Sequence, residues 1–267
     1  MNRNEHAVVG FIGTGAITAA VVTGFCVRAQ GTAFPIVLSP RTRQTAARLQ
    51  AAYPSRVRVA DSVQAVLDQS EWVVLAVPPD QGEAVCRSLR FRTDHKVISF
   101  LPDKSLPQLR DWIGETAMLV HMVPLTFNAL CDGPVLLYPP QSEAAALFGC
   151  IGRVIEVDSP EKMSALSAIT ACVTPLFAVM DTLTAWLREK GVSDAQAVSY
   201  VTGFFDAVCT EAIALDPAGV HRMARESTPG GINLMAKDIL EKAGGFAAWD
   251  MAMEQVLARV AEAPAHG

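Results

Sequence analysis

The stretch GFIGTGAITAAVVTGF, residues 10–25, places two closely spaced glycines after an apolar run and before a segment with helical periodicity. The apolar run Ala7–Ile12 is typical of a buried strand, and Ala16–Gln30 is typical of a helix. Strand, glycine turn and helix follow in the order that a dinucleotide site requires. Gly13 permits the tight turn, Gly15 lets the backbone approach a pyrophosphate, and the helix N-terminus attracts phosphate. The stretch therefore predicts a nucleotide site, and the alternative is a purely structural turn.

The turn departs from the usual three-glycine pattern at its third position, where Thr18 stands. That position mainly serves close packing of the helix on the strand, and a small residue can also provide it. We expect the turn to contact the cofactor through Gly13, Thr14, Gly15, Ala16 and Ile17.

Short apolar, β-branched runs alternate with helical stretches up to about residue 158, which predicts a doubly wound Rossmann domain over residues 1–158. Runs such as WVVLAV lack polar alternation, as strands buried on both faces of a parallel sheet do. The expected strands are 7–12, 34–38, 57–59, 72–77, 96–100, 117–122, 134–138 and 153–157. The expected helices are 16–30, 43–52, 62–69, 81–89 and 106–113.

Residues 159–267 contain helical patterns and no convincing strand, so the fold class is α/β with a second, all-helical dimerisation and substrate domain. We expect a long helix over 161–190, bent at Pro175 and ended at Gly191, followed by helices over 194–215, 232–243 and 246–261. The apolar surface of SALSAITACVTPLFAVMDTLTAWL is too large for a lone small bundle. Its burial against a second subunit predicts a homodimer.

Composition narrows the class of protein further. The chain has 267 residues, 51% of them hydrophobic, and a net charge of −5 with interspersed signs, which argues against nucleic-acid binding. We read no membrane-spanning run and no secretory leader, so we expect a cytoplasmic protein. The six cysteines lie far apart without a metal-ligand spacing, which predicts neither a metal site nor a disulfide framework.

The second strand indicates which dinucleotide binds. An NAD site usually has an acidic residue about 20 residues after the glycines, but IVLSPRTRQT offers Ser39, Arg41, Thr42 and Arg43 instead. A guanidinium suits the 2′-phosphate of NADP(H), and hydroxyls can supplement it. The alternative is that both arginines are solvated helix residues. After the fourth strand, Val77 and Pro78 are expected along the path from the pyrophosphate to the nicotinamide.

Several motifs together resemble the pyrroline-5-carboxylate reductase family: GFIGTGAI, LSPRT, VVLAVPP, VISFLP and, in the helical part, STPGGIN. The resemblance runs from residue 7 to about residue 260. It implies an NADP-type Rossmann domain, a helical dimerisation domain, and reduction of the C=N bond of a cyclic imino acid to give proline. It also implies that the segment around Thr228, Gly230 and Gly231 binds substrate.

The chain departs from the family pattern where substrate binds. The Met-Pro-Asn-Thr-Pro run is replaced by Val123–Phe127, VPLTF, so its asparagine is lost, and the two threonines after the paired glycines become Ile232 and Asn233. The residues that recognise substrate thus differ from those of the family. Another imine or a keto acid is therefore as credible a substrate as pyrroline-5-carboxylate. Hydroxyls, amides and free backbone N–H groups can still form a carboxylate nest, whose expected members are Ser227, Thr228, Gly230, Gly231 and Asn233. An ordinary helix start is the alternative.

A cyclic imine can arrive already protonated, which lowers the demand for a side-chain acid. A ketone would want a donor at the developing alkoxide, and His121, near the end of the sixth strand, is the candidate. The expected catalytic residues are therefore Thr228, Asn233 and His121. The alternative from a different class of protein is a non-catalytic sensor that binds NADPH.

Overall fold

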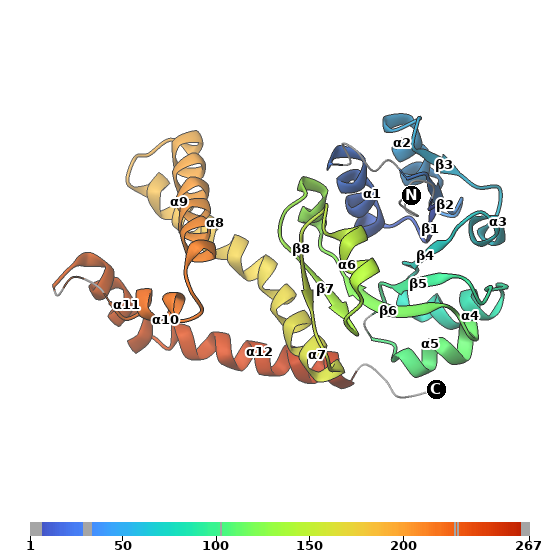
Figure 1. The fold of residues 1–267 in the computed structure, drawn as a ribbon. Coiled ribbons are helices and arrows are strands. Elements are labelled where there is room, and N and C mark those ends of the chain that lie inside the picture. Colours follow the sequence, from blue (N-terminus) through green and yellow to red (C-terminus); the bar gives the residue numbers. More distant parts are fainter. Residues whose placement is uncertain (1–6, 29–33, 102, 227, 229, 263–267) are drawn as a thin grey trace. The chain divides into compact units, whose positions relative to one another are not determined.

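The computed structural model describes residues 7–28, 34–101, 103–226, 228 and 230–262. These residues form an α/β fold with a Rossmann-like sheet domain followed by helices, which confirms the predicted fold class (Figure 1). Two compact units divide between Ser167 and Ala168, and the second unit is Ala168–Ala258. The predicted division after residue 158 lies between the last strand, which ends at Glu156, and the helix that begins at Pro160.

Eight strands form one sheet in the order β3-β2-β1-β4-β5-β6-β7-β8. Each lies within a residue or two of its predicted range. They are β1 (Val9–Ile12), β2 (Ile36–Leu38), β3 (Val57–Val59), β4 (Trp72–Leu75), β5 (Lys96–Ser99), β6 (Met118–Val123), β7 (Pro134–Tyr138) and β8 (Arg153–Glu156). The first six are mutually parallel, with pairs such as Phe11 opposite Val74.

The strand β7 runs antiparallel to β6, with His121 opposite Tyr138, whereas β8 is parallel to β7. The direction reverses because the link from β6 to β7 holds only the short 3-10 helix η2 (Thr126–Leu130), and a parallel connection needs a longer crossover. Buried Asn128 fixes this link: its Nδ2 donates to the carbonyl of Asp132 at 2.8 Å, and its Oδ1 accepts from the Leu125 amide at 2.6 Å.

Helices cover both faces of the sheet. On one face, Phe25 of α1 (Ala16–Arg28), Leu49 of α2 (Arg43–Ala52) and Phe148 of α6 (Ser142–Phe148) pack into one apolar core. On the other, Leu67 of α3 (Val63–Asp68), Cys86 of α4 (Gly82–Arg87) and Leu109 of α5 (Leu106–Ile113) form a second. The central strands β1, β2 and β4 are buried on both faces, which explains the absence of polar alternation in their sequences.

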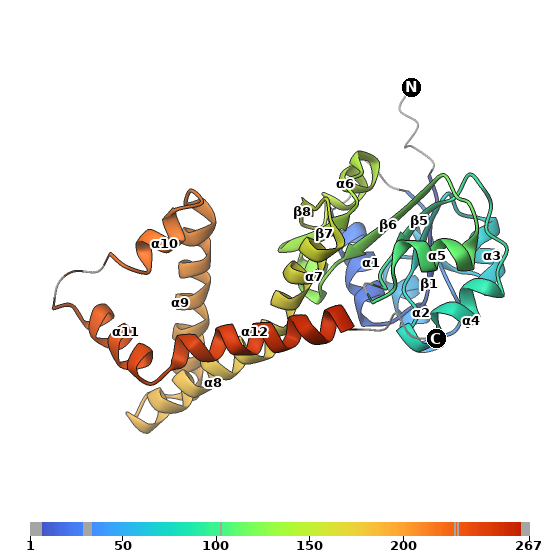
Figure 2. The ribbon, with the colours of Figure 1, turned by 90° about the horizontal axis from the view of Figure 1, so that it is seen from below.

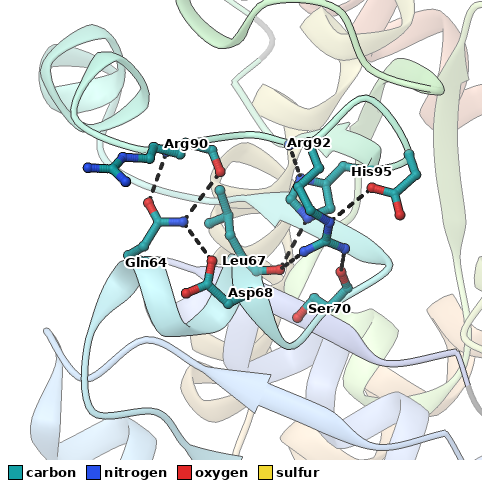
Figure 3. A network of polar contacts seen from close by, with 8 residues as sticks. Gln64, Leu67, Asp68, Ser70, Arg90, Arg92 and His95 are labelled. Atoms are coloured by element: carbon teal, nitrogen blue, oxygen red, sulfur yellow. Dashed lines mark hydrogen bonds and ion pairs between the residues drawn. The ribbon is translucent and has the colours of Figure 1, made fainter.

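A network of hydrogen bonds lies at the amino ends of β4 and β5 (Figure 3). Arg92 donates to the carbonyls of Leu67 and Ser70, at 2.9 Å each, and to Asp94 Oδ1. Buried His95 accepts from the Arg92 amide at 3.0 Å, and desolvation, with the Arg92 charge second, lowers its pKa. The network binds the end of α3 to the loop before β5, so its contacts are structural.

After β8, the elements formed by the described residues are helices: α7 (Pro160–Ala168), the 3-10 helix η3 (Ile169–Cys172), α8 (Val173–Glu189), α9 (Asp194–Ala214), α10 (Gly219–Met223), α11 (Ile232–Lys242) and α12 (Gly245–Glu262). Gly191, with φ +86°, follows α8 as predicted, and α9 runs beside α8. Figure 2 shows α12 as one continuous helix. The long helix predicted over 161–190 is interrupted by η3, one turn before Pro175, and Pro175 lies in the first turn of α8. Pro175 lacks the N–H that would donate to the carbonyl of Ala171 within η3, so the interruption lies where a proline disrupts a helix.

Candidate functional site: a dinucleotide cleft

The glycine turn follows β1 directly and ends where α1 begins at Ala16. Gly13 has φ +101°, a conformation that side chains rarely adopt, and a Cβ there would overlap the carbonyl of Ala76 beyond the end of β4. Gly15, by contrast, has open space where a Cβ would stand. The turn thus presses against β4 at Gly13 and leaves the backbone at Gly15 accessible.

Hydroxyl groups hold the turn in place from two sides. The Gly13 amide donates to Ser39 Oγ at 3.0 Å, and Thr14 Oγ1 donates to the carbonyl of Ser39 at 3.1 Å. Thr18, which replaces the third glycine, is buried and donates from Oγ1 to the carbonyl of Gly13 at 2.9 Å. These bonds fix the path of the backbone before any ligand arrives.

A cleft of about 560 Å³ opens over the turn, at the carboxyl ends of the parallel strands. It contains nine of the ten predicted cofactor residues, namely Gly13, Thr14, Gly15, Ala16, Ile17, Arg41, Thr42, Val77 and Pro78. Strand β1 has β2 on one side and β4 on the other, so the cleft lies at the switch point of the sheet, where ligands of such folds bind.

Ser39, the tenth predicted residue, is buried beneath the turn and does not line the cleft. Its oxygen atoms contact Gly13 and Thr14 instead. Phe100, expected near the nicotinamide from its place after the fifth strand, also lines the cleft, but sequence reasoning did not assign six other lining residues to the cofactor: Thr18, Ala76, Gln81, Met122, Val123 and Pro124. All but Thr18 come after or from the ends of β4 and β6, and that position in the topology is the signal that could have found them.

The charge of the cleft favours an anion. Arg41 is exposed at its rim, and the lining residues include no carboxylate. The thirteen-residue helix α1 points its N-terminus at the turn and has no acidic residue in its first turn. Unpaired N–H groups and the helix dipole there attract phosphate, and a guanidinium binds a second phosphate in its plane.

His121 is not among the residues that line the cleft. Side chains alternate along β6: Met122 packs into the core beside α1, whereas Leu119 packs into the core beside α5, so His121 lies on the α5 face of the sheet. Its burial lowers its pKa to about 4, although the backbone at Lys104 and Ser99 and the charge of Asp103 oppose the shift. The side chain is therefore neutral at pH 7.

The predicted substrate segment lies in the second compact unit. The Gly231 amide donates to the carbonyl of Thr228 at 2.8 Å, and Gly230 adopts φ +76°. Helix α11 begins at Ile232, so Asn233 sits exposed in its first turn. Ser227 lies outside the described residues. The segment presents polar groups at a helix start, as the sequence predicts.

Among the described residues, no group of three or more His, Cys, Asp or Glu side chains is placed to hold a metal ion. The six cysteines are free thiols. The donor set at the cleft is composed of backbone amides, hydroxyls, an amide side chain and a guanidinium, which suits a phosphorylated organic ligand.

Comparison with known proteins agrees with this geometry. Residues 8–103 match the family model described as NADP oxidoreductase, coenzyme F420-dependent. The match spans the glycine turn and the loops after β2, β4 and β5, which line the cleft. No curated protein sequence matches the chain.

Solved structures extend the likeness to the helical part. The pyrroline-5-carboxylate reductase of Streptococcus pyogenes superimposes with a TM-score of 0.81 at 19% identity, covering 96% of this chain and 98% of that one. The Plasmodium falciparum pyrroline carboxylate reductase with NADP bound gives 0.80 at 17% identity, covering 96% and 97%. An Aspergillus terreus imine reductase gives 0.54 at 16% identity, covering 77% and 74%. The chain has the fold of a pyrroline-5-carboxylate reductase over nearly its whole length.

Proposed function

We propose that this chain is an NADPH-dependent reductase that reduces the C=N bond of a small cyclic imino acid. The observation that carries the proposal is the cleft, which combines a preformed glycine turn, the N-terminus of α1 and Arg41 in a chain with the reductase fold. Two of the compared proteins, a pyrroline carboxylate reductase and an imine reductase, hold NADP or a form of NADPH.

Each part of the cleft has a role in this reaction. Backbone amides at the start of α1 bind the pyrophosphate, and Arg41 with Thr42 binds the 2′-phosphate. Val77, Phe100 and Met122 give the opposite end an apolar wall that excludes water from the reacting ring. NADPH, when bound, supplies the hydride. Since His121 does not line the cleft, the imine is expected to arrive already protonated, so that hydride addition to carbon gives the neutral amine.

We infer that the substrate carboxylate binds at Thr228, Gly230, Gly231 and Asn233, with Ser227 as a further candidate. The N-terminus of α11, which has no side-chain cap, and the Asn233 amide are suited to a carboxylate. The family pattern is altered at Ile232, which is 83% exposed, so the imino acid need not be pyrroline-5-carboxylate. If the substrate is pyrroline-5-carboxylate, the protein has a role in proline biosynthesis.

The assay that tests the proposal follows nicotinamide absorbance with purified protein, NADPH or NADH, and a panel of cyclic imino acids and keto acids. Oxidation of NADPH by pyrroline-5-carboxylate supports the proposal in full. Oxidation by another panel member only would replace the substrate. Tight NADPH binding without oxidation by any panel member would favour a non-catalytic sensor, and absence of NADPH binding would overturn the proposal.

We also propose a cytoplasmic homodimer that forms through the helical unit. Large apolar side chains remain exposed on α8 and α9, among them Phe177 at 67% and Tyr200 at 71%. The apolar stretch Pro160–Glu189 is also long and apolar enough to cross a membrane by length and composition, and only 11% of its apolar window is buried within the chain. A second copy would cover this surface in water. Recovery of the protein only with membranes and detergent would contradict this proposal.

A further inference from the structure

Gln81 differs from the other polar side chains of the cleft in having a buried atom without a partner. It ends the 3-10 helix η1 (Pro79–Gln81), which follows β4, and it lines the cleft. In the part of the chain that the structure describes, Gln81 Oε1 is buried and accepts no hydrogen bond. An unsatisfied buried carbonyl oxygen is costly, and a ligand that donates to it is a common reason for its retention.

Neighbouring polar groups of the cleft are already used inside the protein. Thr14 Oγ1 donates to the carbonyl of Ser39, and Thr18 Oγ1 donates to the carbonyl of Gly13. Arg41 and Thr42 lie after β2, on the other side of β1 from Gln81. Among the side chains that line the cleft on the β4 side, Gln81 is thus the one whose acceptor atom is not used within the protein and is left for a ligand.

The backbone around Gln81 is held firmly. Two prolines, Pro78 and Pro79, precede it and restrict the backbone, and its amide donates to the carbonyl of Pro78 at 2.9 Å. At the next residue, Gly82, a Cβ would stand 3.3 Å from side-chain atoms of both Leu101 and Trp112. The backbone that carries the acceptor is therefore fixed before a ligand binds.

The position of Gln81 in the sheet indicates which part of the cofactor it meets. In a doubly wound fold the pyrophosphate lies at the first helix and the adenosine lies toward β2, so the nicotinamide half extends toward β4 and β5. The donors on that half are the ribose hydroxyls and the carboxamide NH₂ group. We propose that Gln81 is a cofactor-positioning residue that accepts a hydrogen bond from the nicotinamide riboside half of NADPH.

This inference rests on the proposed function, and the experiment separates the two. Dissociation constants are measured by calorimetry for wild type and Gln81→Met with three ligands: NADPH, 2′-phospho-ADP-ribose, and 2′-phospho-AMP, which lacks the nicotinamide riboside. We expect Gln81→Met to weaken NADPH about fivefold to tenfold and to leave 2′-phospho-AMP unchanged. The same loss with 2′-phospho-ADP-ribose identifies a ribose hydroxyl as the donor, and no loss with it identifies the carboxamide.

Thermal stability supplies a readout that does not depend on turnover. Gln81→Met removes an unsatisfied acceptor from the free protein, so we expect its melting temperature without ligand to equal or exceed that of wild type, and the increase on adding NADPH to be smaller. Gln50→Met, at an exposed position of α2 outside the cleft, is the matched control and is expected to bind all three ligands as wild type does.

Equal weakening of NADPH and 2′-phospho-AMP, or no weakening of either, would overturn the assignment of Gln81 while leaving the proposed function in place. Failure of wild type to bind NADPH and 2′-phospho-AMP would overturn both. Binding of 2′-phospho-AMP by Gln81→Met also establishes that the variant is folded.

Discussion

The hydroxyl of Ser39, at the end of β2, accepts a hydrogen bond from the amide of Gly13 at 3.0 Å. The position after β2 is near where many dinucleotide sites carry an acidic residue for the ribose. Here the residue is buried and holds the glycine turn, so our proposal places recognition of the ribose phosphate on residues further along the loop, beginning with Arg41.

Replacing Ser39 with alanine tests this role. The change leaves the half-buried Gly13 amide without its acceptor, so we expect the free energy of unfolding to fall by about 1 kcal/mol. NADPH affinity should fall as well, because the turn is no longer fixed in its binding conformation. Urea denaturation and NADPH titration measure the two effects. Ser55→Ala, at an exposed serine, is the control and should match wild type in both.

Thr18 provides a second test of the preformed turn. Thr18→Val keeps the volume of the side chain but removes the hydroxyl that donates to the carbonyl of Gly13, which should cost about 1 kcal/mol of stability. We expect weaker NADPH binding in the same variant. If urea denaturation showed Thr18→Val to be as stable as wild type, the hydroxyl would have no part in fixing the turn.

The sequence predicts the fold more completely than the site. Buried strands are recognised by uninterrupted apolar runs, and the predicted strand at 72–77 contains the observed β4, WVVL. Helix α6, SEAAALF, was missed because seven residues show too little periodicity. The reversal of β7 depends on the short link through Asn128, whose side-chain bonds no local pattern reveals. Likewise, Ser39 contacts Gly13, which is 26 residues away in sequence, and no local pattern marks the oxygen of Gln81 as buried.

Cofactor selectivity should depend on Arg41. Arg41→Ala removes the exposed guanidinium at the rim of the cleft, so we expect the dissociation constant for NADPH to rise about tenfold while that for NADH changes little. The difference should shrink at high salt, because the charge is exposed. Arg48→Ala, an exposed arginine of α2 outside the cleft, is the matched control. Equal loss of both cofactors would argue that Arg41 does not read the 2′-phosphate.

Subunit association should depend on the apolar face of the helical unit. Phe204, Tyr200 and Trp186 lie together around a groove between α8 and α9. Phe204→Glu would bury a charge in the proposed interface, and we expect sedimentation to detect monomers where wild type forms dimers. Gln50→Glu adds the same charge on α2 and should leave the dimer intact. A monomeric wild-type protein would exclude the proposed assembly.

The pH dependence of stability should report the burial of His121. Its pKa is lowered from 6.5 to about 4 because burial penalises the charged imidazolium. The unfolded chain therefore binds a proton more readily than the native state, and stability is lost as pH falls from about 6.5 toward about 4. Between pH 7 and pH 5 this loss amounts to about 2 kcal/mol.

His121→Leu removes the titrating group, so urea denaturation should show a correspondingly smaller loss over this interval. His95, also with a lowered pKa, is retained in both proteins, so the difference between their pH profiles isolates His121. Identical profiles would mean that His121 titrates as it does in the unfolded chain.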